Sequence, residues 1–175
     1  MKKICACVVL FSLFSFIGCA SLEYAQRLRS REEYNSEVSY VYGKFIKTYE
    51  TGAQSWNMGF ILQNLATGEK YGVDFVTDEK VYLISTVPGG YQIVEFIYKW
   101  GQRTVDRQDI RSENIIFEVR KGQAVYIGDW RGSVETGKIA RLRIDSIEDN
   151  FEDTTAEFRN VYASFRNIQT ESVFQ

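Results

Sequence analysis

The sequence predicts an all-β fold, an antiparallel β-sandwich of about seven to eight strands. A C-terminal amphipathic helix is expected to pack on this sandwich, and an N-terminal signal and tether segment to precede it. From residue 38 onward, short β-branched and aromatic runs are separated by turn residues roughly every 8 to 12 positions. No helical periodicity lies between these runs, and a hydrophobic content of 45% is sufficient for a packed core.

Alternation of apolar and polar residues supports the individual strands. In the run from Tyr91 to Trp100, period two places Phe96 and Tyr98 with Val94 on one face, and Tyr91 and Ile93 with Ile97 on the other. Between residues 138 and 147, apolar residues alternate in the same way with arginine and aspartate. The expected strands are Val38–Tyr49, Asn57–Asn64, Glu69–Phe75, Lys80–Ser85, Gly90–Trp100, Asn114–Arg120, Gln123–Asp129 and Lys138–Ile147.

Residues that favour turns lie where this alternation stops. Pro88 is the single proline of the chain, and its fixed φ presets a turn that Gly89 or Gly90 completes. Gly122 is expected in a second hairpin turn, and Gly128 is assigned with it as a structural glycine. The remaining turns are expected at Thr67-Gly68 and Arg131-Gly132.

Helical periodicity is expected only at the two ends of the domain. Aromatic and aliphatic residues recur every three or four positions from Phe151 to Ile168, with Asp149 or Asn150 able to cap the helix. This stripe is expected to pack on a sheet. A shorter helix is expected over Leu22–Tyr34, because apolar residues at positions 22, 25 and 28 have helical spacing.

The first nineteen residues have the pattern of an export signal. Lys2 and Lys3 precede an apolar run that ends at Gly18-Cys19. The tetrapeptide Phe16-Ile17-Gly18-Cys19 resembles the lipobox of bacterial lipoproteins, although phenylalanine stands where leucine is usual. The resemblance implies cleavage between Gly18 and Cys19 and attachment of acyl chains, palmitate among them, to Cys19. Ala20, in place of aspartate after the cysteine, implies sorting to the outer membrane.

Two other interpretations of the leader are weaker. A transmembrane helix needs about 20 apolar residues, and this run is shorter. A simple secretory peptide, cleaved after Ala20, would release a soluble protein. The organisation that we expect is a signal peptide over 1–18, a lipid-anchored tether over 19–37, the sandwich over 38–148 and a helical tail over 149–175.

The cysteine content and net charge of the chain limit the classes of function that it can have. Cys5 and Cys7 lie in the leader and Cys19 is the lipidation site, so the folded domain has no cysteine for a disulfide. Without Lys2 and Lys3, 19 basic residues face 23 acidic ones, a formal charge of −4. This balance, with no basic stripe, argues against a nucleic-acid partner and leaves membrane attachment to the acyl chains.

The chain contains no histidine, which excludes Ser-His-Asp and Cys-His nucleophilic sites and the common zinc sites. Acidic residues cluster around Asp149, but their spacing fits no EF-hand. We therefore expect no catalytic residue, metal or other cofactor. A histidine-free hydrolase with paired carboxylates is kept as a distant hypothesis.

Two segments carry a resemblance to a family. Pro88-Gly89-Gly90-Tyr91 is similar to a "P-G-x-Y" hairpin. Phe117, Val119, Gly122, Tyr126 and Gly128 match "F-x-V-x-x-G-x-x-x-Y-x-G". Together they resemble uncharacterised bacterial envelope lipoproteins with a transthyretin-like or carboxypeptidase-regulatory-like sandwich. The resemblance covers about residues 38 to 148 and implies a fold and an envelope location, without catalytic residues.

The function predicted from these observations is a non-enzymatic, lipid-anchored module of the cell envelope that contacts another envelope protein or polymer. The second hypothesis is a carbohydrate-binding module. Trp56 and Trp130 are expected near strand ends, where their rings, with Arg131 beside the latter, would contact a glycan. If the two rings are exposed and coplanar, the glycan hypothesis gains.

Overall fold

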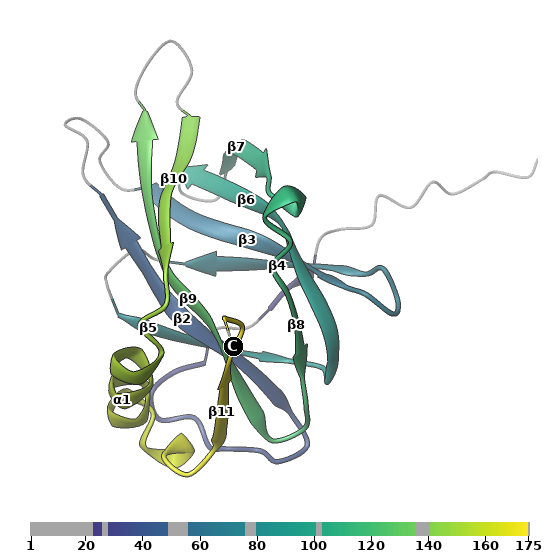
Figure 1. Ribbon diagram of the computed structural model, residues 1–175, viewed down its shortest axis with the longest axis vertical. Coiled ribbons are helices and arrows are strands. Elements are labelled where there is room, and N and C mark those ends of the chain that lie inside the picture. Colours follow the sequence, from purple (N-terminus) through teal and green to yellow (C-terminus); the bar gives the residue numbers. More distant parts are fainter. Residues whose placement is uncertain are drawn as a thin grey trace, which may run out of the picture.

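The computed structural model describes residues 23–25, 28–48, 56–75, 80–100, 103–135 and 141–174. Two β-sheets pack face to face, and one short helix lies on the outer face of one of them (Figure 1). The elements are β1 (Glu23–Tyr24), β2 (Ser39–Lys47), β3 (Trp56–Asn64), β4 (Lys70–Phe75), β5 (Val81–Thr86), β6 (Gly89–Trp100), β7 (Arg103–Asp109), η1 (Arg111–Glu113), β8 (Ile116–Val119), β9 (Gln123–Glu135), β10 (Arg141–Glu148), α1 (Phe151–Val161), η2 (Ala163–Phe165) and β11 (Gln169–Ser172).

Sheet A has the order β1-β4-β3-β6-β7, and β8 also pairs with β6. Sheet B has the order β10-β9-β2-β5, and β11 also pairs with β9. The pairs β1–β4, β2–β9 and β9–β11 are parallel, and the other strand pairs in the described residues are antiparallel. The predicted sandwich is confirmed, with an antiparallel-rich rather than a purely antiparallel topology.

All eight expected strands are present, and the described chain adds three others. β7 has the charged sequence RTVDRQD, which hides its strand character because edge strands carry charges that discourage pairing with other chains. β1 and β11 are short and depend on parallel partners far away in sequence, so neither shows a local pattern.

A β-bulge in the β3–β6 pair changes which residues of β6 face the core. Ile61 pairs with Glu95 and Leu62 with Ile93, so Val94 is the extra residue. Tyr91 and Ile93 therefore join Phe96 and Tyr98 in the core between the sheets, while Val94 belongs to a separate buried cluster. The two faces predicted for this strand from strict alternation are wrong, because the bulge shifts the period by one residue.

The two expected hairpins connect different sheets. Pro88 lies between β5 of sheet B and β6 of sheet A, and Gly122 lies between β8 of sheet A and β9 of sheet B. Both turns exist, and Gly122 adopts the left-handed φ of 67°. The hairpin assignment is wrong because turn residues fix a change of direction but not the partner of the next strand.

Two glycines expected near turns lie inside β9. Arg131-Gly132, predicted as a turn, pairs with β2 and β10, and a Cβ on Gly132 would be 2.6 Å from Met58 Sδ. Gly128 has φ 109° beside a register shift between β2 and β9. At both positions the glycine permits a close approach between packed elements.

The C-terminal helix packs on sheet B as predicted, but it is shorter than the apolar stripe. α1 ends at Val161, and the chain continues through η2 into β11, which pairs with β9. Phe158, Tyr162, Phe165 and Ile168 are all buried. Periodicity therefore identified the buried residues, whereas the sheet edge decided where the helix stops.

The helix predicted over Leu22–Tyr34 is wrong for the described part of that segment. Ala25 N–H donates to Gly72 O in sheet A, and Leu28 N–H donates to Leu83 O in sheet B, both at 2.8 Å. The described backbone thus bonds to the edges of both sheets instead of to itself. The boundaries proposed between tether, sandwich and tail stay predictions.

Candidate functional site

The structure places Trp130 in the core, contrary to its expected position near solvent. Its side chain is 1% exposed, its ring centroid lies 4.8 Å from that of Phe96, and its Nε1–H donates to Ile127 O at 2.9 Å. Arg131 Nε–H donates to Glu148 Oε1 at 2.8 Å. Trp130 is not available as the glycan contact that we predicted, because β9 continues through this position and turns the indole inward, whereas the Arg131 side chain is 41% exposed.

Other predicted site residues lie outside what the structure describes. Gly18 and Cys19 precede residue 23, and the side chain of Trp56 is not among those described, although its backbone belongs to β3. The coplanar pair of exposed tryptophans is therefore excluded by Trp130 alone. Cleavage and lipidation at Cys19 stay predictions.

A buried polar cluster joins β9 to the start of α1. The carboxylate of Asp129, 3% exposed, accepts hydrogen bonds from Tyr126 Oη–H at 3.0 Å and from Thr154 Oγ1–H at 3.0 Å. Asn150 Nδ2–H donates to Asp129 Oδ2 at 3.3 Å, and Asn150 N–H donates to Tyr126 Oη at 3.0 Å. The cluster is assembled from a strand, the residue before the helix and the first helical turn.

Burial shifts the titration of this cluster. It raises the pKa of Asp129 against the hydrogen bonds from Thr154, Tyr126 and Asn150, which favour the carboxylate. Burial also raises the pKa of Tyr126. Perturbed groups of this kind can serve acid–base chemistry, but these donors and acceptors are used to fix α1 on sheet B. Sequence patterns did not reveal the cluster, since Asp129 and Thr154 are 25 positions apart.

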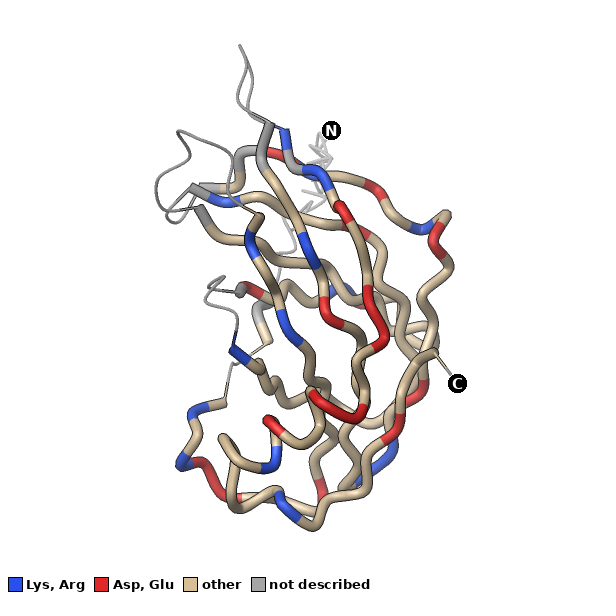
Figure 2. The backbone as a smooth tube through the Cα atoms, turned by 60° about the vertical axis from the view of Figure 1, so that its left-hand side comes forward, with Lys and Arg blue, Asp and Glu red and all other residues tan. Residues whose placement is uncertain are grey.

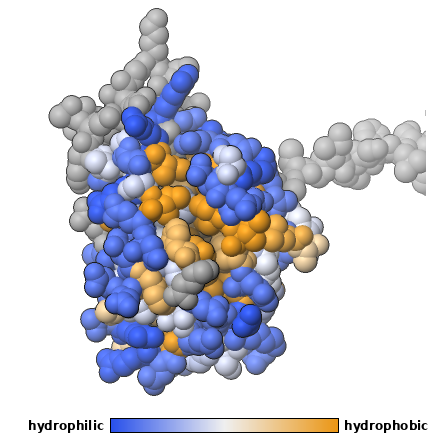
Figure 3. Space-filling view, viewed as in Figure 1, coloured by the Kyte–Doolittle hydropathy of each residue, from blue (hydrophilic) through white to orange (hydrophobic). Residues whose placement is uncertain are grey.

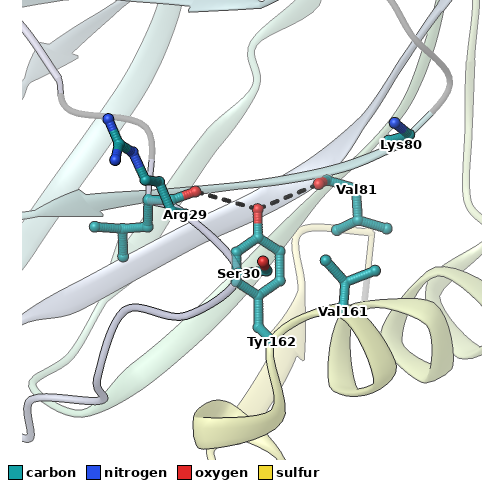
Figure 4. A pocket seen from close by; sticks show the side chains of 7 residues that line it. Arg29, Ser30, Lys80, Val81, Val161 and Tyr162 are labelled. Carbon is teal, nitrogen blue, oxygen red and sulfur yellow. Dashed lines mark hydrogen bonds between the residues drawn. The ribbon is translucent and has the colours of Figure 1, made fainter.

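A hollow of about 400 Å³ lies between the N-terminal segment, β5 and α1. Tyr162 Oη is 3.4 Å from both Leu28 O and Val81 O (Figure 4). In the same view the guanidinium of Arg29 points away from this hydroxyl. The hollow is lined by aliphatic side chains together with Arg29, Ser30 and Lys80, and the Tyr162 hydroxyl in it is already bonded to the backbone.

The acidic residues before and within the start of α1 surround a second shallow hollow, of about 400 Å³. Glu148 is paired with Arg131, and this hydrogen bond holds the pKa of Glu148 below its ordinary value. The residues of the described ranges contain no group of three histidine, cysteine, aspartate or glutamate side chains placed to hold a metal ion. Basic and acidic positions are interspersed along the described chain in Figure 2.

Apolar residues gather in a band on one face of the molecule, across the side that carries β8, β10 and β11 (Figure 3). From these elements and their flanks, Ile115, Ile147 and Val173 pack partly buried against the core between the sheets. Phe174 is 42% exposed and lies against Gly128, where a Cβ would be 3.1 Å from its ring. An exposed apolar surface of this kind is typical of a contact site.

Within the described ranges, helices of the length and apolarity needed to cross a bilayer are absent.

Comparison with known proteins adds little. No protein-family model matches the chain, and no curated protein matches it. A crystal structure from Bacteroides ovatus, provisionally described as a cell adhesion protein, matches with 16% sequence identity and a TM-score of 0.27. The match covers 65% of this chain and 45% of that one, so the chain spans less than half of its length. Similarity at this level carries no inference about fold or function.

Proposed function

We propose that this protein is a lipid-anchored module of the bacterial cell envelope, without enzymatic activity, whose sandwich contacts another envelope protein or polymer. Acyl chains on Cys19 hold it to a membrane, and Ala20 favours the outer membrane. The domain faces the periplasm or the cell surface.

The observation that carries this proposal is the short distance in sequence between Cys19 and the first strand. The apolar leader ends at Cys19, and β1 begins at Glu23, already paired with β4. Four residues extend to at most about 14 Å. The fold thus begins within reach of the acylated residue, as expected for a domain held close to a bilayer.

The chemistry of the described interior agrees with a non-enzymatic role. Two of the buried groups with raised pKa values, Asp129 and Tyr126, bond to each other and to the start of α1. They join two elements and do not line a cleft. The apolar band of Figure 3 is the surface that this proposal offers to a partner.

Metabolic labelling with an alkyne-bearing fatty acid in a Gram-negative host tests the anchor. Wild-type protein and the Cys7→Ser variant, a matched control within the leader, should incorporate the label and sediment with membranes. Cys19→Ser should lose the label, because the acylated thiol is absent. Equal labelling of Cys19→Ser and wild type would contradict the proposal, and density-gradient separation of the two membranes tests the outer-membrane location.

A further inference from the structure

Two turns at one end of the sandwich are joined into a single projection. Asn64, at the end of β3, is 7% exposed, and its Oδ1 accepts hydrogen bonds from Ala66 N–H at 2.9 Å and Thr67 N–H at 3.1 Å. Leu65 N–H donates to Gly90 O at 2.9 Å. The β3–β4 turn is thereby fixed against the connection between β5 and β6.

Large apolar side chains project from this end. Leu65 in the first turn is 50% exposed, and Val87 in the second connection is 64% exposed. Ile116 of β8, which pairs with Gln92, is 47% exposed. These are the three most exposed large apolar residues of the described chain. In Figure 3 the apolar band extends to the β3–β4 turn. We call Leu65, Val87 and Ile116 the apolar tip.

Strand β1 lies beside the same end of the molecule. β1 runs parallel to β4, with Glu23 opposite Tyr71. β4 begins at Lys70, directly after the β3–β4 turn, so Glu23 lies near this turn. Cys19 is four residues earlier in the sequence, a distance of at most about 14 Å.

The charges beside the apolar tip indicate which kind of lipid surface, anionic or zwitterionic, it can bind. Glu69 ends the β3–β4 turn, and Glu118, which pairs across from Gly90, lies 3.9 Å from Arg120 Nε, with both side chains exposed. Lys70 is engaged with Glu95 at 3.2 Å. A border in which acidic and basic side chains are paired has no excess of positive charge to attract anionic lipid, so contact must rest on apolar burial at a zwitterionic surface.

We propose that the apolar tip docks on the bilayer that carries the lipid anchor, with Leu65 and Val87 entering the interface between headgroups and acyl chains. This orients the sandwich with the β3–β4 turn toward the membrane and α1 away from it. The inference rests on the proposed lipidation at Cys19. Each apolar side chain adds only modest affinity, but the anchor keeps the tip at a high effective concentration near the bilayer.

Because the sequence has no cysteine after Cys19, a single cysteine can be introduced at a chosen position and labelled specifically. Leu65→Cys and Val87→Cys, made in the mature acylated protein and labelled with an environment-sensitive fluorophore, should show a blue shift on phosphatidylcholine vesicles. Spin-labelled lipids should quench this emission. Val161→Cys on α1 is the control, because Val161 is 37% exposed and α1 lies away from the β3–β4 turn (Figure 1). Its emission should not change.

The outcomes separate the two proposals. If acylated protein floats with the vesicles while labels at 65 and 87 behave like the label at 161, the docking inference is overturned and the anchor stands. If the mature protein carries no acyl chain and does not float, the proposed function itself fails. A blue shift that appears only when a soluble envelope fraction is added would assign the tip to a protein partner and overturn membrane docking.

Discussion

The outer faces of the two sheets are built differently. On sheet B, residues such as Tyr42 and Leu83 are covered by the C-terminal tail, and Phe158 stacks on Tyr42 with ring centroids 4.6 Å apart. On sheet A, the outer face has a small buried cluster of Ile61, Val94 and Ile97. Among the described residues, no helix covers this outer face, and ion pairs lie on it instead. They include Glu95 with Lys70 at 3.2 Å and Lys99 with Asp74 at 2.6 Å.

This difference explains why some strands are buried at every position and others alternate between buried and exposed residues. A strand covered on both faces is buried at every position, as in Val81–Ile84 of β5 and Gln123–Trp130 of β9. β10, at the edge of sheet B, retains exposed Arg141 and Arg143 around partly buried Ile144. Continuous apolar runs therefore mark strands enclosed by the chain itself, and alternation marks strands that meet solvent.

The largest effect is expected where the tail covers sheet B. Phe158→Ala removes a fully buried ring that stacks on Tyr42, so the free energy of unfolding should fall by about 3–5 kcal/mol. Val161→Ala, on the exposed side of the same helix, should change it by less than about 1 kcal/mol. Urea unfolding followed by tryptophan fluorescence measures both. Similar small losses for the two variants would show that α1 is not part of the cooperative fold.

An intermediate effect is expected at the polar cluster that fixes α1. Asp129→Asn replaces a carboxylate that accepts from Tyr126, Thr154 and Asn150, and it should cost about 1–3 kcal/mol at neutral pH. Because burial raises the pKa of Asp129, its titration adds a second stabilising contribution, separate from the hydrogen bonds, which is complete below the ordinary value of 3.8. Only this pH-dependent contribution is lost as pH rises through the raised folded-state pKa.

The stability advantage of wild type over Asp129→Asn should therefore grow as pH is lowered through that window. Urea midpoints of both proteins, measured at neutral pH and in mildly acidic buffers, give this comparison. An advantage that is constant with pH would mean that Asp129 titrates alike in the folded and unfolded chains.

The smallest effect is expected on the outer face of sheet A. Lys70 is 37% exposed at its side chain, and its partner Glu95 also pairs with Arg107 at 3.4 Å, so Lys70→Gln should lower the free energy of unfolding by less than about 1 kcal/mol. Molar salt should remove most of the difference, because screening weakens exposed pairs. Thermal unfolding at low and high salt tests this. A loss as large as that of Phe158→Ala would show that ion pairs carry this face.

Local sequence patterns located the eight expected strands, because burial against one or two neighbours leaves an alternating or continuous apolar signal. The same patterns misplaced features that depend on pairing. Val94 looks like an ordinary residue of β6, and only its pairing with β3 makes it a bulge. Trp130 resembles a strand-end residue because Arg131-Gly132 follows it, but β9 continues to Glu135 between two partners.

The candidate sites likewise differ in whether a local sequence pattern reveals them. The leader that ends at Cys19 is a local motif, so sequence alone is sufficient to propose it. The Asp129 cluster and the apolar tip depend on contacts between separate elements, such as Leu65 with Gly90, and no spacing in the chain reveals them.

The sequence by itself determined the strand-rich class, the absence of histidine chemistry and the burial of Phe158 and Phe165, since composition and periodicity are properties of short segments. Only the tertiary structure decided which strands share a sheet, where α1 gives way to β11 and which end of the sandwich receives the N-terminal chain. Hydrogen bonds between distant strands set these features, and their partners leave no mark in the residues near either one.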